Sequence, residues 1–214
     1  MMMDHWPMKG LRVTTARLEM RLPTEDELAE LAEVAARGVH PPGSRPFLSP
    51  WTDQPPAAQA RHVIQQHWGR LGEWTPGDWA LELAVFHEGR AVGIQDMRAE
   101  EFPIRREVIT GSWLGLEHQG RGIGTEMRAA ILHLAFAELG CQSATTMSFD
   151  DNLASLGVSR KFGYRPDGIT RDVLDGKVVV SQRLRLSRDD WESTDRPPVT
   201  VTGVRPCLEL FGAG

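Results

Sequence analysis

A glycine-rich segment that runs directly into strong helix formers constrains this chain more than any other feature of its sequence. The segment reads HQGRGIGTEMRAA and has glycine at positions 120, 122 and 124. Glycine destabilises helices and strands because it loses more conformational freedom on folding than other residues do. Three alternating glycines before a predicted helix therefore indicate a backbone conformation, or a close approach, that other side chains would block.

The start of this predicted helix suits an anion. The first four N–H groups of a helix have no partner within it, and the helix dipole adds partial positive charge at that end. Glycines let a phosphate approach these amides, and their left-handed conformations turn successive N–H groups toward one site. We interpret the segment as a phosphate cradle; the alternative is a strand-to-helix turn that binds nothing.

Two common nucleotide-binding motifs do not fit the segment. A P-loop needs lysine and then serine or threonine after its last glycine, but Thr125 and Glu126 follow Gly124. A dinucleotide-binding GxGxxG motif would need glycine in place of Thr125 or Met127. The segment therefore disfavours ATP and GTP, and it lacks the fingerprint of a dinucleotide site.

The composition favours one soluble domain. The chain has 214 residues, 41% of them hydrophobic, a net charge of -5 and a sequence pI of about 5.8, which argues against direct nucleic-acid binding. Cys141 and Cys207 lie far apart without partners at metal-ligand spacing, so we expect neither a disulfide framework nor a metal site. No apolar run of about 18 residues occurs, so a cytoplasmic protein without membrane contact is expected.

Periodicity and helix-breaking residues predict a mixed α/β sheet. Thr24 and Glu27 have the spacing of a capping box, and the pair Asp175 and Gly176 suits a hairpin turn. Strands are predicted over residues 13–22, 79–86, 91–97, 108–116 and 142–149 and in a closing hairpin over 169–186. Helices are predicted from Thr24 to residue 38, over 57–71, from the glycine segment to residue 139, and over 152–162. We expect residues 1–192 to form the domain and residues 193–214 to form an arm that packs on it or on a second subunit.

Two motifs together resemble one known family. The first is Q-x-x-G-x-G, carried by Gln119, Gly122 and Gly124, and the second is N-x-x-S, carried by Asn152 and Ser155 ahead of the glycine and tyrosine at 163–164. This combination resembles the GNAT superfamily of acyl-CoA-dependent N-acyltransferases. The chain is most similar to the branch with ribosomal-protein N-terminal acetyltransferases, and as a whole it resembles a mycobacterial GNAT succinyltransferase. The resemblance implies the GNAT fold, a mostly antiparallel, twisted α+β sheet with a central parallel strand pair, flanked by helices.

The resemblance also implies a coenzyme A site on the glycine segment. In the family, backbone amides of this segment hold the diphosphate of coenzyme A, and Arg121 would add a charged partner. Many relatives place a tyrosine where this chain has Ser159, so Ser155 is the expected contact of the coenzyme sulfur. Asn152 and Ser155 have the alternative of only satisfying the first turn of their own helix. The implied coenzyme-binding residues are Leu114, Leu116, Gln119, Gly120, Arg121, Gly122, Ile123, Gly124, Thr125, Asn152 and Ser155.

The implied reaction is direct attack of an amine on a thioester carbonyl, with a backbone N–H of residues 114–116 as donor to the oxyanion. Deprotonation at pH 7 costs about 1 to 1.4 kcal/mol for an α-amino group and roughly 4 to 5 kcal/mol for a lysine side chain. Many relatives have a glutamate on the strand before the glycine segment, but residues 108–116 contain no carboxylate. Glu82 and Asp96 are the candidate bases, acting directly or through water; the alternative is that both are ordinary exposed or paired carboxylates.

These features predict an acyltransferase that moves an acetyl or succinyl group from acyl-CoA to a primary amine of a protein N-terminus, a lysine or a small molecule. A succinyl group would need a cation, for which Arg45, Arg98, Arg105 and Arg106 are available. Four tryptophans at 51, 68, 74 and 79 are expected on the acceptor side or in the core. The competing hypothesis is a non-catalytic acyl-CoA sensor or partner module. We expect a homodimer or a higher homo-oligomer, with the segment VTVTGV as a pairing strand.

Overall fold

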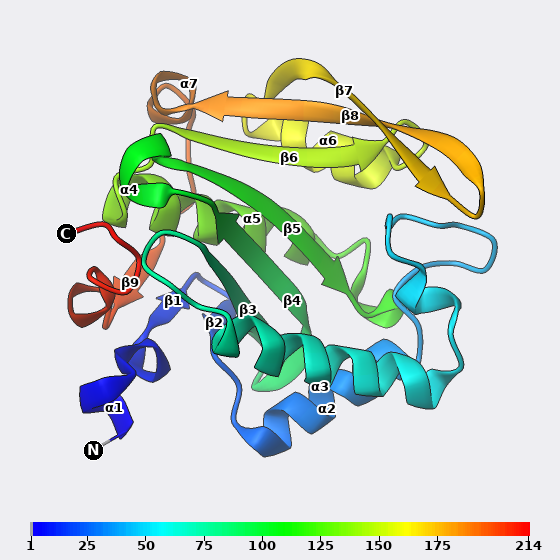
Figure 1. Cartoon of the computed structure of the whole chain (residues 1–214), viewed down its shortest axis with the longest axis horizontal. Coiled ribbons are helices and arrows are strands. Elements are labelled where there is room, and N and C mark those ends of the chain that lie inside the picture. The colour runs from blue at the N-terminus through cyan, green and yellow to red at the C-terminus, as the bar shows by residue number, and fades with distance from the viewer. Residues whose placement is uncertain (1) are drawn as a thin grey trace.

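One sheet of nine strands forms the framework of the computed structural model, which describes residues 2–214. The strand order is β7-β8-β6-β5-β4-β3-β2-β1-β9, and among the described residues β5 and β6 form the parallel pair while the other neighbours are antiparallel (Figure 1). The strands are β1 Arg12–Thr14, β2 Leu18–Arg21, β3 Trp79–His87, β4 Arg90–Ala99, β5 Glu107–Leu114, β6 Ser143–Phe149, β7 Arg165–Leu174, β8 Lys177–Ser187 and β9 Thr200–Thr202. The mostly antiparallel mixed α/β sheet predicted from the sequence is confirmed.

Helices cover both faces of this sheet (Figure 1). They are α1 Met2–His5, α2 Glu25–Ala36, α3 Pro56–Gly72, α4 Phe102–Arg105, α5 Ile123–His133, α6 Leu153–Lys161 and α7 Arg188–Glu192. On one face, Leu31 of α2 and Val63 of α3 pack on Ile94 of β4. On the other face, Met127 and Ile131 of α5 are fully buried in the main core. Two separate apolar layers thus hold the sheet between the pair α2–α3 and the pair α5–α6.

Two predicted elements differ from the structure for local reasons. Residues 13–22 form the hairpin β1–β2 instead of one strand, because the N–H of Thr15 bonds to the carbonyl of Leu18 at 3.0 Å and turns the chain. The helix predicted to reach residue 139 changes at Leu134–Glu138 into a π-helical segment, and Gly140 then ends it with φ of 73°. The other strands and helices for which a range was predicted lie within a few residues of that range.

Two predicted local signals are confirmed. Thr24 caps α2 in a capping box with Glu27, in which each side chain bonds to the other residue's backbone N–H. Asp175 and Gly176, between β7 and β8, have φ of 51° and 71°, as the predicted hairpin turn requires.

The tail at residues 193–214 packs on the domain. Its strand β9 pairs with β1 at one edge of the sheet. Phe211 is fully buried, and its carbonyl accepts a hydrogen bond from the Trp79 indole at 3.1 Å, while the Leu210 carbonyl accepts one from Trp74 at 2.7 Å. This packing completes an aromatic cluster at the far end of the sheet from the glycine segment.

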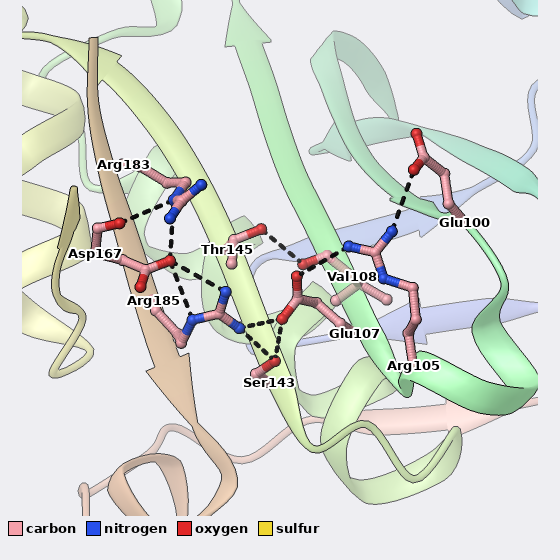
Figure 2. Close-up of polar contacts among 9 residues, drawn as sticks. All are labelled: Glu100, Arg105, Glu107, Val108, Ser143, Thr145, Asp167, Arg183 and Arg185. Atoms are coloured by element: carbon pink, nitrogen blue, oxygen red, sulfur yellow. Dashed lines mark hydrogen bonds and ion pairs between the residues drawn. The ribbon is translucent and has the colours of Figure 1, made fainter. Parts of the chain in front are cut away.

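A polar network holds together the paired end of the parallel strands β5 and β6, at Glu107 and Ser143. Ser143 of β6 donates to Glu107 of β5 at 2.6 Å, and the Arg185 guanidinium of β8 contacts both of them. Asp167 of β7 accepts from Arg185 and from Arg183, each at about 3 Å, so charged side chains link four strands (Figure 2). We call this set the strand clamp. Burial by itself would raise the pKa of Glu107, but the hydrogen bonds from Ser143 and Arg185 outweigh it and hold that pKa below its usual value.

The strand clamp predicts an acid-sensitive contribution to stability. Glu107→Gln removes the charge that Arg185 faces, so at pH 7 the free energy of unfolding should fall by about 1 to 3 kcal/mol. Since the folded-state pKa lies below the unfolded one, this contribution exists above the carboxyl's ordinary pKa and is lost as the pH falls through the folded-state value. Urea unfolding curves should therefore differ at pH 7 and converge only below the ordinary carboxyl pKa of about 4.3, where Glu107 becomes protonated in the folded protein.

Glu100→Gln is the matched control, because Glu100 pairs with Arg105 at 3.3 Å but its side chain is 73% exposed. Its unfolding curve should stay close to that of the unmodified protein. Equal curves for Glu107→Gln and the unmodified protein at pH 7 would contradict the clamp.

Candidate functional site

The site begins where the parallel strands separate. β5 and β6 pair at Glu107, Val108 and Ile109, and no pairing continues beyond Ile109 and Thr145 in the described residues. Thr146 still donates its hydroxyl to the Thr110 carbonyl at 3.0 Å, and beyond this point the two strands diverge (Figure 1). The other edge of β5 stays paired with β4 as far as Leu114. The end of β5 therefore has one free edge of backbone groups, which an extended ligand could bind.

The glycine segment lies at the open end of this separation. Gly120 and Gly122 have φ of 71° and 78°, a left-handed conformation that glycine adopts readily. Gly122 is the N-cap of α5 and makes no side-chain capping bond, so the first amides of this eleven-residue helix lack a protein acceptor. A β-carbon at Gly120 would meet no atom within 4 Å, so the space above the loop is open. The segment therefore has the geometry expected of an anion cradle.

Neighbouring side chains fix the cradle in place. Gln119 donates from its side-chain amide to the carbonyls of Val39 (2.7 Å) and Leu114 (3.0 Å), so it anchors the loop. Arg17 forms an ion pair of 2.6 Å with Glu126 in the first turn of α5 and donates to the carbonyl of Arg121 at 3.2 Å. The side chain of Arg121 itself is exposed.

The other implied coenzyme-binding residues differ in how accessible they are. A β-carbon at Gly124 would lie 3.8 Å from Leu114 Cδ1, which places the start of α5 beside the end of β5. Ile123 is buried in the core, whereas Leu116 is 40% exposed. Thr125 lines a cavity of about 560 Å³ that also touches Gly122 and the tail at 195–198.

Across the separation, α6 begins directly after β6. The Asn152 side chain accepts from the Ser155 N–H at 3.1 Å, so Asn152 is the N-cap of this helix. Ser159 is fully buried and donates its hydroxyl to the Ser155 carbonyl at 3.1 Å. The half-buried Ser155 hydroxyl makes no hydrogen bond within residues 2–214, and it remains available to a ligand.

The two candidate bases are cross-strand neighbours. Glu82 of β3 lies opposite Asp96 of β4, and Asp96 lies opposite Gly111 of β5. A β-carbon at Gly111 would be only 2.6 Å from Asp96 Oδ2, so glycine is what lets this carboxylate reach over β5 toward the separation. With strands about 4.8 Å apart, Asp96 is one strand from the opening and Glu82 is two.

Burial sets the protonation of this pair. Glu82 is 5% exposed; its Oε1 accepts from Gln66 of α3 at 2.5 Å, and its Oε2 has no partner. Burial, reinforced by the Asp96 charge, raises the pKa of Glu82 to about 7. Burial also raises the pKa of Asp96, against the attraction of Arg98, whose Nε lies 3.7 Å from Oδ1. Of the alternative that both are ordinary exposed or paired carboxylates, exposure does not apply, but each carboxylate does have a cationic neighbour, Arg70 for Glu82 and Arg98 for Asp96.

Aromatic side chains form a rim on the same face as the acid pair. Trp51 packs against Trp113 of β5 (5.9 Å between ring centroids), Phe47 (5.5 Å) and His62 of α3 (5.3 Å). Burial lowers the pKa of His62 and so favours its neutral form. The tryptophans at 74 and 79 instead stack on each other in the core, and the one at 68 is 52% exposed. Of the four tryptophans considered from the sequence, Trp51 is therefore the one that joins this rim.

A salt bridge joins two segments at this end of the sheet. Arg45, in the loop before α3, pairs with Asp53 at 3.2 Å and with Asp175 at the tip of the β7–β8 hairpin. Figure 1 shows this loop and the hairpin tip side by side at the end where β5 and β6 diverge. The loop and the hairpin therefore flank the opening.

A family model settles the identity of the fold. Residues 17–165 match the model of the acetyltransferase (GNAT) domain. The chain belongs to the GNAT family. The parallel pair that opens beside a glycine-rich helix start is thus the GNAT framework, and the family resemblance inferred from the two motifs is confirmed.

Solved structures share this GNAT fold at low sequence identity. RimL, a ribosomal-protein alpha-N-acetyltransferase in complex with coenzyme A, is 19% identical with a TM-score of 0.60, over 82% of this chain and 97% of that one. RimJ from Mycobacterium smegmatis, in complex with CoA-disulfide, is 15% identical with a TM-score of 0.64, over 92% and 91%. The self-immunity acetyltransferase MccE, in complex with acetyl-CoA and AMP, is 15% identical with a TM-score of 0.59, over 80% and 93%.

Three polar residues of the GNAT site were missed from the sequence. Gln66 and Arg70 of α3 lie at 2.5 Å and 4.0 Å from Glu82, and Arg128 of α5 is 4% exposed. The Gln66 and Arg70 contacts depend on how α3 packs on β3, for which the sequence carries no signal. Arg128 could have been found, because it lies one turn after Gly124 on the face of the helix that meets the sheet.

Two kinds of feature are absent from the part of the chain that the structure describes. Within residues 2–214, no group of three or more histidine, cysteine, aspartate or glutamate side chains is placed to hold a metal ion. None of the helices described here combines the length and apolar character needed to cross a bilayer.

The cradle predicts that Gly124→Val weakens coenzyme A binding while the fold survives. Position 124 has an ordinary backbone conformation, and its β-carbon would make only a normal contact with Leu114, so valine adds bulk at the open end without backbone strain. We expect the dissociation constant to rise about tenfold or more, a loss of about 1.4 kcal/mol per factor of ten. Isothermal titration calorimetry with coenzyme A measures this.

Gly69→Val is the matched control, because Gly69 lies in α3 and its β-carbon would meet no atom within 4 Å. Both variants should show similar melting temperatures, and the control should bind coenzyme A normally. Unchanged binding by Gly124→Val would remove the case for the cradle.

Proposed function

We propose that this GNAT protein transfers an acyl group, acetyl or succinyl, from acyl-CoA to a primary amine, with a protein N-terminus as the favoured acceptor. The observation that carries the proposal is the uncapped, glycine-rich start of α5 beside the free edge of β5. A diphosphate on the cradle would let the rest of the coenzyme extend along that edge, where the strands are no longer paired. RimL was solved in complex with coenzyme A and MccE in complex with acetyl-CoA, so proteins with this fold bind ligands of this class.

The proposed reaction needs three groups from the chain: a donor to the developing oxyanion, a donor to the departing sulfur and an acceptor for the proton of the amine. The amine nitrogen bonds to the thioester carbon, the carbon–sulfur bond breaks, and the coenzyme leaves as a thiol. Backbone N–H groups on the free edge of β5 would stabilise the oxygen that gains negative charge, as aimed amides in a dry site do. The free hydroxyl of Ser155 would donate a proton or a hydrogen bond to the departing sulfur, and Asn152 would position it by capping the helix.

Asp96 and Glu82 would accept the proton that the amine loses. Both lie on the face of the sheet that carries the aromatic rim, and Asp96 reaches over Gly111 toward the opening. Glu82, with a pKa near 7, would receive the proton from Asp96 directly or through water. Such a relay suits an α-amine, which deprotonates at a cost of about 1 to 1.4 kcal/mol at pH 7, better than a lysine. The ribosomal-protein acceptor in the name of RimL agrees with this choice.

A non-catalytic acyl-CoA sensor is the second candidate. Its support is that β5 carries no carboxylate beyond Glu107 and that Ser159, bonded within its own helix, stands where many relatives have a tyrosine. The cytoplasmic location, the homo-oligomeric assembly and the domain boundary at residue 192 remain predictions from the sequence.

Release of free coenzyme A thiol tests the proposal. The protein should release thiol from acetyl-CoA or succinyl-CoA with a peptide that has a free N-terminus, and much less with the same peptide blocked at its N-terminus. Tight acyl-CoA binding without turnover on any peptide, lysine or small amine would favour the sensor. Absence of both binding and turnover would overturn the two candidates together.

Ser155→Ala is the informative variant in this assay. We expect its turnover number to fall about tenfold or more, as for loss of an acid that assists a leaving group, with coenzyme A affinity almost unchanged. Ser159→Ala is the control on the same helix and should keep its turnover number. An unchanged turnover number in Ser155→Ala would mean that Ser155 has only a structural role.

The acid pair predicts a pH dependence. Because Glu82 has a pKa of about 7, its basic form increases as the pH rises through that value, and kcat/KM should rise with it. In Glu82→Gln, the rise of kcat/KM near pH 7 should disappear. Only the rise caused by deprotonation of the amine itself, at about pH 8, should remain. Glu192→Gln, at an exposed carboxylate on α7, is the control. A wild-type profile in Glu82→Gln would exclude the relay.

A further inference from the structure

A buried cation on α5 has no hydrogen-bonded counter-ion among residues 2–214. Arg128 is 4% exposed, and its Nε and Nη1 atoms make no hydrogen bond within residues 2–214. Asp96 interacts with it only through space, because that carboxylate lies on the opposite face of the sheet, toward α3. Burying an unpaired charge costs several kcal/mol, and an arginine cannot lose its proton to avoid that cost. Arg128 is therefore expected to have an anionic partner that is not part of the chain.

Arg128 lies on the α5 side of the sheet, close to the point where β5 and β6 separate. Its guanidinium carbon lies 6.0 Å from the centre of the Tyr164 ring. The Tyr164 hydroxyl is 3.5 Å from the Thr110 hydroxyl, and the Thr110 carbonyl holds Thr146 across the last contact between the two strands. These contacts place Arg128 at the closed inner end of the opening, on the side of α5.

The same helix connects this cation to the cradle. Gly124, at the mouth, and Arg128 are four residues apart and share one face of α5, the face that meets β5. At about 1.5 Å per residue, Arg128 lies roughly 9 Å inward from Gly122 along the helix axis. A molecule held by its diphosphate at the cradle and extended along β5 would bring its acyl end toward this guanidinium.

Gln95 adds a second unsatisfied group on this side of the sheet. It is fully buried; its side-chain amide donates to the Gly111 carbonyl at 2.7 Å, and its Oε1 has no partner. By strand alternation Gln95 faces α5, away from its neighbour Asp96. Because the Oε1 atom of Gln95 only accepts hydrogen bonds, it calls for an N–H donor at the inner end of the opening and not for a second carboxylate.

We infer that Arg128 binds the terminal carboxylate of the acyl group, so that the preferred donors are thioesters of short dicarboxylic acids, such as succinyl-CoA. This rests on the proposed function and names its donor class. The diphosphate is bound at the mouth and the amine acceptor carries no negative charge at its reacting end, so the acyl chain is the part that can bring an anion to this depth. A guanidinium recognises a carboxylate by two parallel N–H···O bonds, which also gives specificity over neutral chains.

Binding of three ligands tests the inference. Isothermal titration calorimetry compares succinyl-CoA, butyryl-CoA of the same carbon count with a neutral end, and coenzyme A itself. The unmodified protein should bind succinyl-CoA at least tenfold more tightly than butyryl-CoA. Arg128→Gln should abolish that preference while its affinity for coenzyme A changes by less than about threefold, and Arg128→Lys should keep part of it.

Arg105→Gln is the control, because Arg105 pairs with Glu100 and Glu107 at the closed end of the strand pair, outside the opening. Its preference for succinyl-CoA should match that of the unmodified protein. Thermal melts verify that each variant is folded, and Arg128→Lys, which keeps the charge, replaces Arg128→Gln if the latter unfolds.

Two outcomes would overturn the inference. One is equal affinity of the unmodified protein for succinyl-CoA and butyryl-CoA. The other is an equal loss for all three ligands in a folded Arg128 variant, which would make Arg128 a contact of the coenzyme or of the leaving sulfur. In both cases coenzyme A still binds, whereas failure of coenzyme A to bind at all would defeat the proposed function instead.

Discussion

The short parallel pairing of β5 with β6 is the constraint on which the rest of the site depends. The two strands pair over Glu107–Ile109 and then separate, while β5 stays fixed to β4 and β6 stays fixed to β8. The strand clamp around Glu107 and Arg185 holds the closed end together. Because one end is held by charges and the other is free, the sheet can keep an opening in its middle without losing its outer strands.

The opening separates charges of opposite sign. On the side of α3, Glu82 and Asp96 form an acidic pair in which burial raises the pKa of both carboxyls, that of Glu82 to about 7. On the side of α5, Arg128 is buried without a carboxylate beside it. An amine that loses a proton and an acyl chain that ends in a carboxylate would thus approach from different faces, and each would meet a complementary group. The glycine at 111 links both sides, because it makes room for Asp96 and offers its carbonyl to Gln95.

In the proposed function, side chains at the mouth would select the acceptor. The aromatic rim around Trp51 and Trp113 lies next to the acid pair, and the salt bridge from Arg45 to Asp175 brings a loop and a hairpin tip together there. These segments come from distant parts of the chain and carry no part of the coenzyme cradle. Substitutions in this rim would therefore alter the choice of acceptor without changing the residues proposed to bind the thioester.

The sequence by itself predicted most of the strands and helices, the helix start at 120–125 and, through two motifs, the GNAT family, because each of these depends on residues adjacent along the chain. It named Glu82 and Asp96 as candidates but left open whether they were exposed. Only the tertiary structure made them neighbours, through the register of β3 and β4, and buried Glu82 under α3. It also decided that Nε and Nη1 of Arg128 have no hydrogen-bond partner within residues 2–214, and that Trp51, unlike the tryptophans at 74 and 79, faces the site. Burial and pKa depend on what packs against a side chain from elsewhere in the chain, and no local pattern contains that information.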